Sequence, residues 1–455
     1  MTRNYLIKPT LDHDYPTISH GNGIYLYDID GNQYIDGSSG AVTASIGHGV
    51  VDVVEAMTKQ ARKVSFAYRS HFTNEAAEAL AKKLSELAPG DLNWSFFVNS
   101  GSEATETAMK IAIQHWQEKG FERKNRIVSR WTSYHGITMG ALSMSGHVPR
   151  RKRFVPLLED FPSISAPYCY RCPFNNETSG CKLQCANELE TAIQRVGSEN
   201  IAAFIAEPII GASAGAVTPP DGYYQRIKEI CENYDILFIA DEVMTGIGRT
   251  GKMFAMEHWG VTPDIIALGK GMSAGYTPMA ATMVTDRIME PILKGSKSIM
   301  AGHTYSANPL SAAVSLEVLS YIEGNDLVQA AEVKGQYLFK KLQGLAEKFD
   351  IIGDVRGKGL LLGLEFVSDR ISKTPFDLQI ALTTRLVNKA FAKGLLIYPA
   401  AGAIEGIAGD AVILSPPLII TNEEIDRLVK ILEASLEELQ QELHVEGLIE
   451  DMQAI

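Results

Sequence analysis

Two side chains with complementary chemistry each follow a short apolar run typical of a buried strand. Asp241 comes directly after residues 236–240, and Lys270 follows residues 265–268. Because ligands in parallel α/β proteins bind outside the carboxyl ends of the strands, we expect both groups to face one site. A lysine amine can form an imine with a cofactor aldehyde, and a carboxylate can hold a protonated ring nitrogen, which is the pattern that pyridoxal phosphate requires. The alternative is an ordinary strand-end ion pair.

A predicted anion site lies earlier in the chain, where a strand over residues 95–98 is followed by a glycine turn and a helix. Ser100, Gly101 and Ser102 stand at this turn. The first turn of a helix presents free N–H groups and the positive end of the helix dipole, which together suit a phosphate. Ser102 could instead cap the helix, with Glu106 nearby, and this role is compatible with phosphate binding.

Tyr134 and Glu207 are two further candidates, each after a predicted strand. Tyr134 could lie against a flat pyridine ring, although a lone aromatic residue before a glycine more often packs in a core. Glu207 follows residues 202–206, and a carboxylate there is costly to bury unless it is paired. It therefore either meets a polar group of the site or an arginine, or faces water in a turn.

Seven motifs extend this pattern along the chain. They are, in order, YLYDIDGNQYIDGSSG, NSGSEATETAMK, SYHG, AEP, DEVMTGIGRTG, LGKGMSAG and GHTYSANP. On these motifs the chain resembles the class III (ornithine/ω-amino acid) pyridoxal phosphate-dependent aminotransferases of fold type I, over almost its whole length. The resemblance implies an α/β fold with a large, mostly parallel-sheet domain (61–331) and a smaller α/β domain built from both chain ends (1–60 and 332–455).

Local patterns add detail to the smaller domain. Residues 24–36 are typical of a β-hairpin because two aromatic and β-branched runs flank an Asp-Gly turn. In the C-terminal third, strands are predicted at 360–367, 395–398 and 411–415, between amphipathic helices.

The resemblance also implies a role for each candidate residue, with Lys270, Asp241 and Tyr134 as the catalytic residues. Lys270 would carry the cofactor and then move the substrate proton, and Asp241 would hold the ring nitrogen. Tyr134 and Val243 would enclose the ring from opposite faces. Thr304 would reach the phosphate of the neighbouring subunit, which implies a homodimer, with a tetramer as the larger alternative. Further cofactor contacts are implied for Ser100, Gly101, Ser102, His135, Gly136 and Glu207.

The implied reaction is a ping-pong transamination, in which an amine becomes a carbonyl compound and a keto acid, pyruvate or 2-oxoglutarate, then becomes an amino acid. A pyridoxal phosphate-dependent decarboxylase or racemase on the same fold is the alternative, since it would use the same Lys270 and Asp241. A non-enzymatic regulatory or metal-binding protein with a vestigial pocket is disfavoured, because Lys270, Asp241, Gly101 and Thr304 are all retained.

Three apolar residues narrow the substrate. Met244 and Ile210 stand where relatives that handle ornithine or GABA usually carry glutamine, and Ile413 stands where they tend to place a carboxylate-binding arginine. These residues favour an amine or an ω- or β-amino acid, taurine-like or β-alanine-like, over an α,ω-diamino acid. The keto acid still needs a counterion for its carboxylate. Arg69 and Arg130 are the candidates, although each could instead form a structural ion pair.

Composition limits the possible partners and location. The chain has 455 residues, 45% of them hydrophobic, and a net charge of −12. This charge argues against broad binding to nucleic acid or to acidic membranes. No apolar run approaches the roughly 20 residues of a membrane span, and the first residues lack the apolar core of a signal peptide. We therefore expect a cytoplasmic protein whose substrates are small molecules.

Four of the five cysteines are grouped with the spacing C-x2-C-x8-C-x3-C, at Cys169, Cys172, Cys181 and Cys185. Four thiolates could hold a structural zinc ion, since they would leave no open coordination position. The alternative is a surface loop with free thiols or an adventitious disulfide, and no metal site is assigned on the sequence alone.

Overall fold

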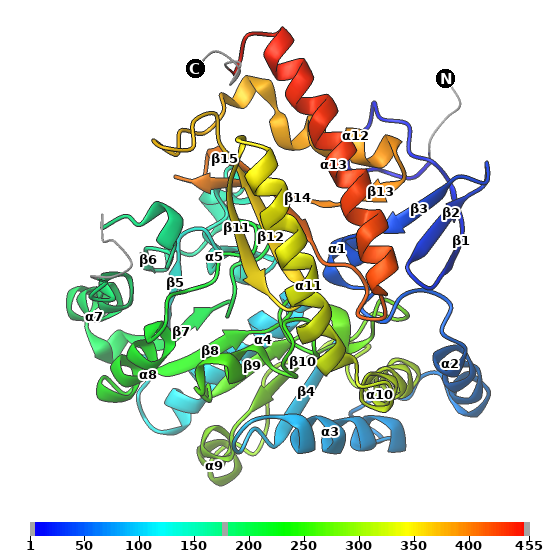
Figure 1. Ribbon diagram of the computed structural model, residues 1–455. Coiled ribbons are helices and arrows are strands. Elements are labelled where there is room, and N and C mark those ends of the chain that lie inside the picture. The colour runs from blue at the N-terminus through cyan, green and yellow to red at the C-terminus, as the bar shows by residue number, and fades with distance from the viewer. Residues whose placement is uncertain (1–4, 175–180, 450–455) are drawn as a thin grey trace.

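A seven-stranded sheet forms the centre of the computed structural model, which describes residues 5–174 and 181–449 (Figure 1). Strand β10 runs antiparallel to both of its neighbours, and the remaining neighbours pair in parallel. The sheet is therefore mostly parallel, as predicted. In spatial order its strands are β4 (Trp94–Val98), β10 (Ala280–Val284), β9 (Ile265–Leu268), β8 (Leu237–Asp241), β7 (Ile201–Ala206), β5 (Arg126–Arg130) and β6 (Ser163–Ile164).

Helices cover both faces of this sheet, which explains why its central strands are apolar throughout. In β7, Ala203 and Ile205 belong to the cluster that contains Trp116 of α4, whereas Phe204 belongs to the cluster that contains Ile227 of α8. Successive side chains of the strand therefore enter different cores. The covering helices are α4 (Gly101–Glu118) and α9 (Asp286–Lys294) on one face, and α7 (Gln184–Val196) and α8 (Tyr223–Asn233) on the other.

The smaller domain is built from both chain ends and contains two four-stranded sheets. In the first, β13 from the C-terminal third pairs in parallel with β3 from the N-terminal hairpin. The second is antiparallel and is packed against long helices (Figure 1). The strands of the first are β1 (Ile18–Asn22), β2 (Tyr25–Asp28), β3 (Gln33–Asp36) and β13 (Leu395–Leu396), and those of the second are β11 (Ile352–Lys358), β12 (Leu361–Phe366), β15 (Ala408–Leu414) and β14 (Tyr398–Ile404).

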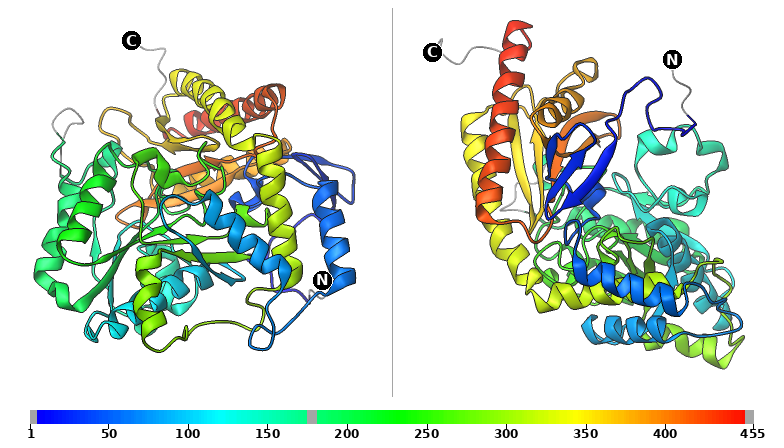
Figure 2. Two further views of the ribbon diagram at one scale, coloured as in Figure 1. Left: turned by 90° about the horizontal axis from the view of Figure 1, so that it is seen from below. Right: turned by 90° about the vertical axis from the view of Figure 1, so that its right-hand side faces the viewer.

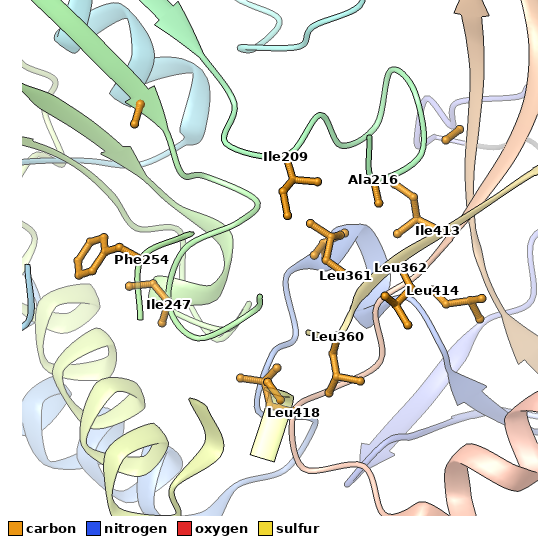
Figure 3. Packing of buried hydrophobic residues seen from close by; sticks show 14 of the residues in the cluster. Ile209, Ala216, Ile247, Phe254, Leu360, Leu361, Leu362, Ile413, Leu414 and Leu418 are labelled. Carbon is orange, nitrogen blue, oxygen red and sulfur yellow. The ribbon is translucent and has the colours of Figure 1, made fainter. Parts of the chain in front are cut away.

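The remaining helices form two groups, one around α10 and one on the small domain. Helix α10 lies against α2 and α3, beside the large sheet (Figure 2). At the junction, Leu361 of β12 and Ile413 of β15 share an apolar cluster with Ile209, which follows β7 (Figure 3). These helices are α2 (Val51–Lys63), α3 (Glu75–Leu87) and α10 (Pro309–Gly324), and those on the small domain are α11 (Leu327–Lys348), α12 (Leu382–Ala392) and α13 (Asn422–Val445).

Within the described residues, no helix has the length and apolar character needed to cross a bilayer. The domain borders at residues 60 and 331 stay predictions. The first falls inside α2 and the second inside α11, so two helices run across the predicted borders.

Candidate active site

Residues at the carboxyl ends of five strands, β4, β5, β7, β8 and β9, line one cavity of about 160 Å³. The structure thus brings together all of the predicted site residues except Ser100 and Thr304. Ala212 and Met244 complete the lining. The predicted residues in the lining are Gly101, Ser102, Tyr134, His135, Gly136, Glu207, Asp241, Val243 and Lys270.

Lys270 begins a short 3-10 turn two residues after β9 and has a backbone φ of 42°. This left-handed conformation costs a side-chain-bearing residue about 1–3 kcal/mol and persists where the surrounding structure imposes it. Burial lowers the pKa of Lys270 to about 8, although the carboxylates of Asp241 and Glu207 act in the opposite direction. An amine with this pKa is partly neutral near physiological pH, so it can act as a nucleophile and as a base.

Asp241, the last residue of β8, is only 4% exposed. Its Oδ2 lies 2.7 Å from Nδ1 of the buried His135, and its Oδ1 accepts the N–H of Val243 at 3.1 Å. In the described part of the chain, Nε2 of His135 has no hydrogen-bond partner. The imidazole and the backbone N–H therefore fix the orientation of a carboxylate that still lines the cavity, as binding a protonated ring nitrogen requires.

The start of α4 also lines the cavity. Ser100 caps this helix, because its Oγ accepts an N–H of the first turn at 3.3 Å, and it does not line the cavity as Gly101 and Ser102 do. A Cβ on Gly101 would lie 2.7 Å from Cγ1 of Val243, and one on Gly136 would lie 2.5 Å from Oγ of Ser102. A side chain at either position would therefore collide with its neighbour, so glycine is favoured at both. The N–H groups at the start of α4 and the hydroxyl of Ser102 can then bind an anion.

Glu207 follows β7 and is 5% exposed. Its carboxylate accepts the N–H of Gly211 and the N–H of Tyr134, each at 3.1 Å. Burial raises the pKa of Glu207. The alternative of a water-facing turn carboxylate is therefore wrong, and the residue joins the loop that carries Tyr134 to the loop after β7.

The two arginines predicted as carboxylate ligands do not line the cavity. Arg130 is fully buried, and its guanidinium donates to the carbonyl of Glu207 at 2.7 Å. This prediction is wrong because the last side chain of β5 points into the core, where it pairs with backbone. Arg69 is exposed and donates to the carbonyl of Ala301 at 2.8 Å, on the molecular surface.

The sequence analysis missed Arg150 of the short helix α6 (Val148–Arg151). Its guanidinium carbon lies 4.3 Å from the centre of the Tyr134 ring. The signal available in the sequence was a run of four basic residues, 150–153, that follows the SYHG motif by 14 residues. No spacing rule predicts that such a run lies near the cavity. Arg150 reaches Tyr134 only because α5 (Met139–Ser143) and α6 bring the chain back toward it.

The four grouped cysteines surround a second, smaller cavity, away from the first. Their thiols are free, and burial raises the pKa of Cys169 to about 11 and that of Cys185 to about 12. Among the residues that the structure describes, no three metal-ligating side chains are placed to hold a metal ion. A structural zinc ion stays a prediction for this group. Cys231, by contrast, is a residue of α8 and is buried in the core.

The first cavity fits pyridoxal phosphate on three observations. The start of α4 suits the phosphate, the carboxylate of Asp241 is held by His135 for a ring nitrogen, and Lys270 is a low-pKa amine in the same lining. Tyr134 and Val243 are placed to contact a flat ring.

Comparisons with known proteins agree with this geometry. The family model described as aminotransferase class-III matches residues 9–436. The aminotransferase YodT of Bacillus subtilis is 56% identical over 429 residues, which are 94% of this chain and 96% of that protein. The putrescine–pyruvate aminotransferase of Pseudomonas aeruginosa is 34% identical over 92% of this chain and 90% of its own length. A solved (S)-enantioselective ω-transaminase from Thermomicrobium roseum superposes with a TM-score of 0.90 at 36% identity, covering 96% of each chain.

Proposed function

Because the chain belongs to the class III aminotransferases, which are enzymes that use pyridoxal phosphate, we propose that it moves an amino group from an amine or an ω- or β-amino acid to pyruvate or 2-oxoglutarate. The observation that carries this proposal is one cavity lined by Lys270, the Asp241–His135 pair and Gly101 and Ser102 at the start of α4. The relatives described above are aminotransferases or transaminases, and none of them supports the decarboxylase or racemase alternative.

Each of these residues has a task in the proposed reaction. Bound pyridoxal phosphate supplies the aldehyde that takes up the amino group and the ring that accepts electrons from the substrate carbon. Asp241 keeps the proton on the ring nitrogen, and His135 holds that carboxylate in place. Lys270, whose amine would hold the cofactor aldehyde, would also move the proton from the substrate carbon as a general base. Tyr134 and Val243 keep the ring flat against the site.

The donor class is inferred from the apolar side of the cavity. Met244 and Ala212 line it, so a carboxylate at this side would find no counterion in either residue. Ile210 and Ile413 are buried in apolar clusters outside the lining. The names of two relatives, a putrescine–pyruvate aminotransferase and an ω-transaminase, support an amine donor. Taurine-like and β-alanine-like donors are also proposed, because Arg150 stands beside the cavity.

We further infer that the catalytic unit is a homodimer. Thr304 is exposed and does not line the cavity of its own chain, which leaves it free to serve a neighbouring site. Beside it lies an exposed apolar patch in which Phe66 meets Tyr305 edge to face at 5.6 Å. The patch residues are between 42% and 79% exposed and comprise Phe66, Tyr68, Phe72, Met300 and Tyr305. Sedimentation of the purified protein tests this, and a monomer would contradict it. The cytoplasmic location stays a prediction from composition.

The reaction is tested by product stoichiometry. Each of the amines putrescine, 1-phenylethylamine, β-alanine and taurine is incubated with pyruvate, and amine, pyruvate and alanine are quantified together. The proposal expects at least one amine whose loss is matched mole for mole by alanine. Release of carbon dioxide from an α-amino acid, with no loss of pyruvate, would instead establish a decarboxylase.

A further inference from the structure

A keto-acid acceptor brings a carboxylate into a cavity from which the two predicted counterions are absent. Arg130 is buried in the core, and Arg69 does not line the cavity of its own chain and donates to the backbone carbonyl of Ala301. Ile413 stands in an apolar cluster rather than at the cavity. An anionic substrate that enters this cavity needs a cation or a set of hydrogen-bond donors, since an unpaired buried carboxylate is strongly disfavoured.

Two guanidinium groups act electrostatically on Lys270, those of Arg150 and Arg249. Arg249 is 2% exposed and donates to the carbonyls of Leu360 and Pro416, at 3.1 and 2.6 Å. Its hydrogen-bonding capacity is therefore used in joining the two domains. Arg150 is half-buried, and in residues 5–174 and 181–449 no acidic side chain forms an ion pair with it.

Arg151, the next residue in the sequence, has a structural role in this loop because its guanidinium is bound to backbone carbonyls. Arg151 donates to three carbonyls, those of Leu142, Ser143 and Ser145, at 3.0, 3.1 and 2.6 Å. Arg150 instead lies over the ring of Tyr134, a residue of the cavity lining. Burial raises the pKa of Tyr134, and a hydrogen bond from the Arg150 guanidinium to its hydroxyl acts in the opposite direction. Contact with the aromatic ring and its hydroxyl holds the plane of the guanidinium, and the N–H groups that Tyr134 does not use suit two-pronged binding of a carboxylate.

We propose that Arg150, oriented by Tyr134, binds the carboxylate of the keto-acid acceptor and of those donors that carry one. The inference rests on the proposed aminotransferase function and assigns the acceptor-binding residue within it. The ligand class is a short 2-keto acid such as pyruvate, whose carbonyl then faces Lys270. When the donor is an amine without a carboxylate, Arg150 stays hydrated. The same cavity thus accepts an uncharged substituent of the amine in the first half-reaction and the carboxylate of the keto acid in the second.

The test uses holoenzyme loaded with pyridoxamine 5′-phosphate, so that no amine donor has to be known. Single-turnover reaction with pyruvate is followed by the absorbance of the cofactor. Arg150→Met, which keeps an unbranched stem but removes the guanidinium and its charge, should raise the pyruvate concentration for half-maximal rate about 10- to 100-fold. Arg150→Lys should give an intermediate effect, because it keeps the charge without the fork. Arg153→Met, at an exposed position of the same loop, is the matched control and should equal wild type.

A second readout does not depend on turnover. Propionate resembles the acceptor but has no keto group, and its dissociation constant is measured from its effect on the cofactor spectrum. Arg150→Met should weaken propionate binding by the same factor as pyruvate, with an unchanged maximal rate. Equal pyruvate and propionate affinities in wild type and Arg150→Met, or a loss in Arg69→Met instead, would overturn the inference. If wild type reacts with neither pyruvate nor 2-oxoglutarate, the proposed function fails, and propionate binding still decides the role of Arg150.

Discussion

The cavity has two sides that are built differently. On the cofactor side, Asp241 and Glu207 are about 95% covered, and each carboxylate is held by two partners, one of them an imidazole in the case of Asp241. We assign the substrate side to Met244, which lines the cavity, and to Arg150, which lies against Tyr134; both are half-buried, and they lie on a loop and a short helix. Rigid strand ends therefore fix the chemistry, while the segments that tolerate change carry specificity. The following variants should separate the two sides.

Removing the central amine should have the largest effect. Lys270→Ala deletes both the group that carries the cofactor and the base that moves the proton, so the rate of transamination should fall about 10⁴-fold. The rate of alanine formation checks this, and Lys252→Ala, at an exposed position, is the control and should be unchanged. A Lys270→Ala protein that keeps a tenth of the activity would show that another residue does this work.

The pKa of Lys270 predicts how cofactor binding depends on pH. Only the neutral amine attacks the aldehyde, and burial lowers this pKa to about 8. The rate at which cofactor-free protein captures pyridoxal phosphate should therefore rise about 50-fold from pH 6 to pH 8 and then level off. Stopped-flow absorbance measures the rate, and the same titration with N-acetyl-lysine corrects for ionisation of the cofactor. A rate that keeps rising to pH 10 would show an amine with an ordinary pKa.

A larger residue at Gly101, where the phosphate is expected to bind, should weaken cofactor binding and have a smaller effect than the loss of Lys270. A Cβ added by Gly101→Ala would lie 2.7 Å from Cγ1 of Val243, and overpacking of this kind costs about 1–3 kcal/mol. The dissociation constant of pyridoxal phosphate should increase about tenfold. Gly344→Ala is the matched control, since its Cβ meets nothing within 4 Å. Equal losses in the two variants would remove the argument for a close approach at Gly101.

The smallest effect is expected on the substrate side. Met244→Gln places an amide in the apolar part of the cavity lining, so kcat/KM for 1-phenylethylamine should fall by less than about tenfold. Binding of pyridoxal phosphate should be unchanged, because the Met244 side chain packs at Gly211 and makes no hydrogen bond to the Asp241–His135 pair. Cofactor affinity measured by fluorescence provides that second readout, and a parallel loss of affinity would contradict the division into two sides.

The cofactor side could be predicted from sequence because its signals are local. Strands that are buried on both faces are continuous apolar runs, so the positions of Asp241 and Lys270 at their ends followed directly. The glycine turn before α4 was equally clear. Ser100 was the exception, since a serine at a helix start can cap the helix or bind an anion, and only the geometry decides.

What sequence reasoning missed depends on contacts between distant segments. Strand β14, with the sequence YPAAGAI, is made of small residues and a proline, and it resembles a loop until it pairs with β15. The parallel pairing of β13 with β3 joins residues about 360 positions apart, for which no local signal exists. Arg150 was missed for the same reason, and Arg130 was misjudged because its direction from β5 depends on the sheet around it.

The most direct test of the account follows the cofactor through one half of the reaction. Purified holoenzyme is mixed with a single amine, such as 1-phenylethylamine, putrescine, β-alanine or taurine, with no keto acid present, and its visible spectrum is recorded. The account predicts that at least one amine bleaches the cofactor band and that pyruvate or 2-oxoglutarate then restores it. A band that no amine bleaches, or that no keto acid restores, would contradict the assignment of this cavity as the site of transamination.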